Sequence, residues 1–241
     1  MAPVRTPDGS LVDEDGRVLF FSTERFIRDI CLGQCCFICG CQPGERAFTN
    51  EHILPRWILR RYDLFSRQIT LPNDTPFRYD QYTVPCCTDC NALMGRMLEE
   101  PIREIFCRGH QGLVDHLIAN GPLLIFVWLS LVFVKTHLKD RSLRQHRNPI
   151  AGHEMISQDY DWAGLHHVHC IARAFYTRCE VDAAAHGSML FLAAKVHSGF
   201  EMFDFSDVHH ARSILIRFDD FAIVSVLDDG CGAWCAFGTR A

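Results

Sequence analysis

The sequence of 241 residues lacks several features that mark common classes of protein. No apolar stretch follows Arg5 near the start, so the sequence indicates no secretory signal. The longest apolar run, PLLIFVWLSLVFV at residues 122–134, is 13 residues long, whereas a bilayer span requires roughly 20. We therefore expect a buried helix in this run, no membrane contact and a cytoplasmic protein.

Excess positive charge is also missing, because 24 Lys and Arg stand against 29 Asp and Glu, a net charge of −5. Any contact with nucleic acid must then come from a local basic face. Dinucleotide-binding G-x-G-x-x-G, P-loop and H-E-x-x-H patterns are not found, which argues against nucleotide hydrolysis and zincin chemistry. With 48% hydrophobic residues, the chain suits one large or two small globular domains.

Cysteine is abundant, with 13 residues. Without a secretory signal, clustered cysteines favour metal binding over disulfides. Cys36-Phe-Ile-Cys39 and Cys87-Thr-Asp-Cys90 are two C-x-x-C knuckles. Two such turns can hold one tetrahedral structural Zn²⁺ through four thiolates. One alternative is a C-x3-C spacing that uses Cys35 or Cys86, and another is that the cysteines are buried free thiols. A third is a redox pair, at Cys231 and Cys235 or at one of the knuckles. A second metal site formed by Cys231, Cys235, His167 and His169 is also considered.

The residue pattern predicts an α+β fold in three parts. Residues 1–30 form an extension with a short strand at 17–21 and a helix capped by Ser22 or Thr23. Residues 31–108 form a metal-stapled module that ends in a helix from Pro101 to Arg108. In residues 109–241 we expect a helix from about Asp115 or Pro122 to His137. A small antiparallel sheet of runs 166–177, 188–196, 211–218 and 221–227 follows.

Between the knuckles lies Glu51-His52-Ile-Leu-Pro-Arg-Trp, and Asn91 directly follows the second knuckle. This order of motifs resembles the zinc-stapled branch of the HNH endonucleases, which have a ββα-metal (His-Me finger) fold. The resemblance covers about residues 31–108 and implies that His52 is the general base. It also implies that Glu51 and Asn91 hold a catalytic Mg²⁺ or Mn²⁺. Members of the family often have Asp where this chain has Glu51, and Asn73 is the one candidate for the middle Asn of the motif.

Elementary chemistry is consistent with these roles. A neutral imidazole takes a proton from water near pH 7, and carboxylate and amide oxygens suit a hard divalent ion. Glu99 lies eight residues after Asn91, about 80° round an α-helix, and is a supporting candidate. Taken singly, a Glu-His pair is more often incidental and an Asn after a knuckle is often only a helix cap.

Basic residues beside His52 are the candidates for nucleic-acid contact. Arg56, Arg60 and Arg61 would present guanidinium groups next to the motif if residues 55–61 are helical. A second basic stretch covers residues 135–147. The sequence therefore predicts a metal-dependent HNH endonuclease that acts on DNA. The alternative is a non-catalytic, zinc-stapled module that binds nucleic acid or protein. Residues 109–241 carry no motif that assigns a role, and target selection, a homodimer contact and a regulatory partner stay open for them.

Overall fold

The computed structural model describes residues 3–179, 186–195 and 202–229, which form the mixed α+β fold that the sequence predicts. The first sheet is antiparallel and contains β1 (Val4–Arg5), β2 (Leu11–Val12) and β3 (Val18–Phe20). Helix α1 (Thr23–Arg25) follows and continues as a π-helical segment, Phe26–Cys31. The Ser22 hydroxyl caps this helix by accepting a hydrogen bond from the Arg25 amide, so the predicted cap is confirmed.

An antiparallel strand pair followed directly by a helix forms the centre of residues 31–108. Strand β4 (Phe48–His52) pairs with β7 (Thr83–Cys87), with Phe48 opposite Cys87 and His52 opposite Thr83. The chain then runs through α3 (Thr88–Met94), a π-helical turn (Gly95–Glu99) and α4 (Glu100–Phe106). The segment between the two strands contains α2 (Arg56–Arg61), β5 (Gln68–Thr70), β6 (Pro76–Arg78) and a 3-10 turn (Tyr79–Gln81).

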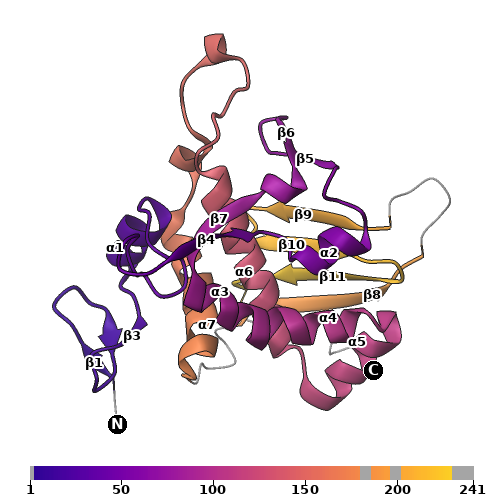
Figure 1. The fold of residues 1–241 in the computed structure, drawn as a ribbon, viewed down its shortest axis with the longest axis horizontal. Coiled ribbons are helices and arrows are strands. Elements are labelled where there is room, and N and C mark those ends of the chain that lie inside the picture. The colour runs from indigo at the N-terminus through magenta and orange to yellow at the C-terminus, as the bar shows by residue number, and fades with distance from the viewer. Residues whose placement is uncertain (1–2, 180–185, 196–201, 230–241) are drawn as a thin grey trace.

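Two helices, rather than one, follow this centre. Helix α5 (Gly109–Asn120) ends at Gly121, whose φ of 72° is the left-handed conformation that favours glycine. Helix α6 (Leu123–Asp140) then begins after Pro122, so the later of the two expected starts is right. Most of α6 is buried, and in Figure 1 it runs between α7 and the C-terminal sheet. The loop after α6 protrudes and holds 3-10 turns at Pro149–Ala151 and Ile156–Asp159.

The expected strand at residues 166–177 is wrong, because these residues belong to helix α7 (Trp162–Thr177). The Asp161 carboxylate caps the helix by accepting a hydrogen bond from the Gly164 amide. Buried residues recur with helical spacing at Trp162, Leu165, Val168 and Ala172. The alternating histidines and β-branched residues of this segment mimic a strand, but burial of the helical stripe against α6 decides the outcome.

The C-terminal sheet has the strand order β8-β11-β10-β9, and every neighbouring pair is antiparallel. Its strands are β8 (Ser188–Ala193), β9 (Asp204–Val208), β10 (Ser213–Arg217) and β11 (Phe221–Val226). Three of these strands fall within predicted runs, whereas β9 was not predicted. Phe106 of α4 contacts Phe218 and Phe221 edge to face, which joins this sheet to the helical layer.

Candidate functional site

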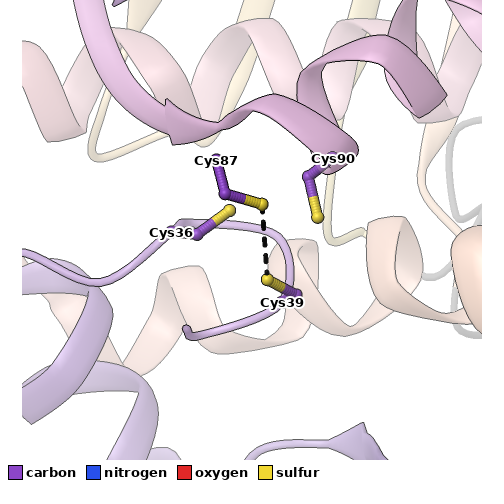
Figure 2. A group of neighbouring side chains, drawn as sticks. All are labelled: Cys36, Cys39, Cys87 and Cys90. Carbon is purple, nitrogen blue, oxygen red and sulfur yellow. Dashed lines mark hydrogen bonds between the residues drawn. The ribbon is translucent and has the colours of Figure 1, made fainter. Parts of the chain in front are cut away.

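Four cysteines from two separate segments converge at one point of the structure. Cys36 and Cys39 lie in the loop after the first π-helical segment, Cys87 ends β7, and Cys90 lies in the first turn of α3. Their sulfur atoms all lie within 4.8 Å of one another, and Figure 2 shows the side chains pointing toward a common centre. The cysteines that the sequence analysis grouped therefore form one cluster that could hold a metal ion.

The donor set and spacing of this cluster fit zinc. Four thiolates at about 2.3 Å from a tetrahedral Zn²⁺ place their sulfurs about 3.8 Å apart, and those of Cys39 and Cys87 are 3.7 Å apart. Hydrogen bonds from neighbouring thiols, that of Cys39 foremost, hold the Cys36 pKa well below its usual range. The hydrogen bond to Cys36 in turn raises the pKa of Cys90. A divalent ion at the centre would allow all four thiols to ionise together.

Helix α7 contacts backbone carbonyls of the first knuckle, Cys36 to Cys39, through two buried side chains. The His169 imidazole is 2.7 Å from the Phe37 carbonyl oxygen, and the Arg173 guanidinium donates a hydrogen bond of 2.8 Å to the carbonyl of Ile38. Arg173 also donates to the carbonyls of Leu19 and Val18, and it is 4% exposed. A buried cation at this position would offset part of the negative charge of metal-bound thiolates. Sequence reasoning missed this support because it assigned residues 166–177 to a strand.

A pocket of about 300 Å³ opens beside β4. Glu51, His52, Asn91 and Glu99 all line it, although they come from β4, α3 and the π-helical turn. Asn91 immediately follows Cys90, so the cysteine cluster fixes the start of the helix that presents Asn91. The π-helical turn advances less per residue around the axis than an α-helix, which brings Glu99 toward the face that carries Asn91.

Lys135 of α6 is only 1% exposed and does not itself line this pocket, but it contacts residues that do. Its ammonium group donates hydrogen bonds to Oε1 of Glu51, at 2.9 Å, and to the carbonyl of His52, at 2.8 Å. Oε1 of Glu99 lies 4.0 Å from the same nitrogen. Burial raises the pKa of Glu99 to about 7, while Lys135 opposes and nearby Glu51 adds to the shift. Sequence reasoning missed Lys135, although a lysine that follows 13 apolar residues inside a helix was a usable signal.

His52 is half-buried, and this burial lowers its pKa below the ordinary value, while Glu51 acts in the opposite direction. The imidazole is therefore neutral near pH 7. Interaction with the Asp80 backbone, like that with Glu51, opposes this shift of the His52 pKa. Asn73 does not line the pocket: its amide nitrogen donates to the Arg144 carbonyl and its oxygen accepts from the Thr75 amide in the β5–β6 turn.

The three arginines of α2 have different surroundings. Arg56 lies at the rim of the pocket and is exposed, as is Arg60. Arg61 instead donates to Asp219 at 2.6 Å and to the Phe106 carbonyl at 3.2 Å, so it ties α2 to the C-terminal sheet and to α4. Arg103 of α4 lines the pocket together with Arg56 and was not among the predicted contacts.

The second basic stretch does not form one exposed surface. Besides the buried Lys135, Lys139 lies over the Phe77 ring and Arg141 donates to the carbonyls of Ile30 and Cys31. Arg144 and Arg147 are exposed on the protruding loop. The second metal site that sequence reasoning considered is not formed by His167 and His169 on a strand, since both lie in α7, and Cys231 and Cys235 lie outside the described residues.

Comparison with known proteins gives no match: no family model, no curated protein and no solved structure corresponds to this chain. Among the described helices, none is by itself long and apolar enough to cross a membrane. Helices α5 and α6, bent by 114° at their junction, meet the length and composition requirement only as a pair.

Proposed function

We propose that residues 31–108 are an HNH-type nuclease module with a ββα-metal (His-Me finger) fold and that the protein hydrolyses DNA phosphodiester bonds. One observation carries the proposal. Glu51, His52 and Asn91, which the motif resemblance singles out, line a single pocket on the β4, β7 and α3 frame that also holds the four-cysteine cluster.

In the proposed reaction, His52 is the general base that takes a proton from the attacking water. Its lowered pKa keeps it neutral and able to accept this proton near pH 7. Arg56 and Arg103 face the pocket and would contact the phosphate groups of the substrate.

Glu51 and Asn91 offer a carboxylate and an amide oxygen, with Glu99 nearby, and these hard donors suit Mg²⁺ or Mn²⁺. When bound there, the ion would stabilise charge on the phosphate and on the leaving oxygen. The cysteine cluster would hold structural Zn²⁺ and keep Asn91 opposite β4. The thiolate donors are thus assigned to Zn²⁺, and the oxygen donors are assigned to Mg²⁺ or Mn²⁺.

Nicking of supercoiled plasmid by the zinc-loaded protein tests this function. We expect cleavage that requires Mg²⁺ or Mn²⁺ and that falls at least about 100-fold in His52→Ala, the usual range for loss of a general base. Zinc content and circular dichroism of the variant must match those of the wild type. DNA binding without any cleavage would favour the non-catalytic binding module instead, and equal cleavage by both proteins would contradict the assigned base.

A further inference from the structure

Lys135 does not line the pocket, yet it contacts two of the lining carboxyl groups from a helix outside residues 31–108. Its buried ammonium group contacts Glu51 and the His52 backbone at once, and Glu99 lies at 4.0 Å. Burying a charge in this way is unfavourable unless partners compensate it. The two carboxylates and the His52 carbonyl provide that compensation, so Lys135 and the pocket depend on each other.

The hydrogen bond from Lys135 makes the two carboxylate oxygens of Glu51 inequivalent. Oε1 is occupied by the ammonium group at 2.9 Å, and the Glu99 carboxyl lies within hydrogen-bonding reach of Glu51, so one oxygen of Glu51 is not bound by the lysine. Oε1 of Glu99 is buried and has no hydrogen-bond partner within the described part of the chain. Both carboxylates therefore keep capacity for a cation, while a fixed positive charge already lies beside them.

We infer that Lys135 is a positioning residue that limits how tightly and how deeply the pocket holds a divalent ion. This inference rests on the proposed function. The ammonium group prevents Glu51 from binding the ion through both oxygens, and like charges repel more strongly at low dielectric. The ion is then kept on the open side of Glu51, beside Asn91, where a phosphate oxygen can reach it.

A purely structural role for Lys135 gives a different expectation. If the lysine only supported the pocket, its loss would weaken ion binding and slow cleavage together. If it acts as the inference states, its loss removes a repulsive charge and frees Oε1, so the ion binds more tightly. Cleavage nevertheless slows, because the ion moves away from the substrate. The opposite signs of these two effects distinguish the roles.

The experiment measures Mn²⁺ binding to the zinc-loaded, full-length protein from the electron paramagnetic resonance signal of free Mn²⁺, in parallel with kcat for cleavage of duplex DNA. In Lys135→Met we expect Mn²⁺ to bind at least about tenfold more tightly, given the lost repulsion, with a lower kcat. Lys135→Gln, which keeps a donor but no charge, should show the same tightening and serves if the Met variant does not fold. Lys139→Met, one turn further along α6, is the matched control and should leave both quantities unchanged.

The outcomes separate this inference from the proposed function. Unchanged or weaker Mn²⁺ binding in the folded Lys135 variants overturns the inference, and metal-dependent cleavage by the wild type would still support the nuclease. No Mn²⁺ binding by any of the proteins overturns both. Tighter Mn²⁺ binding with slower cleavage supports both.

Discussion

The cysteine cluster and the polar pocket are built on the same strands and helix, yet they are held together differently. All four cysteines come from residues 31–108, in two short motifs whose spacing alone indicates the ligand set. The pocket takes Glu51, His52 and Asn91 from the same segment, but its charge is compensated by Lys135, 84 residues from Glu51 in sequence. A closed thiolate site is thus defined locally, whereas a buried polar site depends on a distant partner.

The largest expected effect concerns the four-cysteine cluster, whose members all come from residues 31–108. Replacing Cys87 by Ser should abolish zinc binding and unfold much of residues 31–108, because metal binding to such sites contributes about 10 kcal/mol or more to folding. Metal analysis and thermal unfolding followed by circular dichroism measure this. Cys86→Ala is the matched control: its sulfur lies 3.7 Å from that of Cys36 but is outside the mutually close group, so it should retain zinc. Retention of zinc by Cys87→Ser would contradict the claim that the two knuckles together form the zinc site.

The next largest effect concerns Lys135, which is distant in sequence from its partner Glu51. Lys135→Met leaves Glu51 buried without its cation, and loss of one member of a buried ion pair typically costs about 3–5 kcal/mol. The Glu51→Gln/Lys135→Met double variant removes both charges and should recover most of this loss. Urea unfolding of the two single variants and the double variant measures the coupling. Additive losses would show that the pocket does not depend on this pair.

The arginines of α2 sharpen the contrast between ligand contact and packing. We expect the Arg56→Ala/Arg60→Ala variant to reduce the slope of log affinity against log salt for DNA by about 2, one per lost phosphate contact. Arg61→Ala should leave this slope unchanged and lower the melting temperature, since Arg61 is engaged with Asp219. Fluorescence anisotropy with a labelled duplex measures the slopes. A reduced slope in Arg61→Ala would contradict the assignment.

The smallest effect tests the support of the cysteine cluster by α7. Burial lowers the pKa of His169 to about 3, whereas an unfolded histidine titrates near about 6.5. The unfolded state therefore takes up a proton first, and the contribution of His169 to stability is lost as pH falls below about 6.5, by up to about 1.4 kcal/mol per unit. His169→Gln, which keeps a donor for the Phe37 carbonyl, should show a smaller fall between pH 7.5 and 5.5. Equal slopes would contradict this account.

The sequence predicts the parts of this molecule that short-range patterns control. The two knuckles, the Ser22 cap and the helix that carries Arg56 follow from residue types at fixed spacings. The same reasoning fails for α7, where two alternating histidines outweighed the helical stripe of buried residues. It also cannot place Lys135 against Glu51, because such a contact depends on how α6 packs against β7 and not on any local preference.

The nuclease account is tested most directly by chemical rescue of His52→Gly. This variant removes the imidazole but leaves the pocket open to small molecules. If His52 is the general base, added imidazole should restore Mg²⁺-dependent cleavage of plasmid in proportion to the concentration of neutral imidazole, while zinc content stays unchanged. A zinc-loaded, folded variant that imidazole does not rescue, or one that cleaves as fast as the wild type without imidazole, would contradict the account.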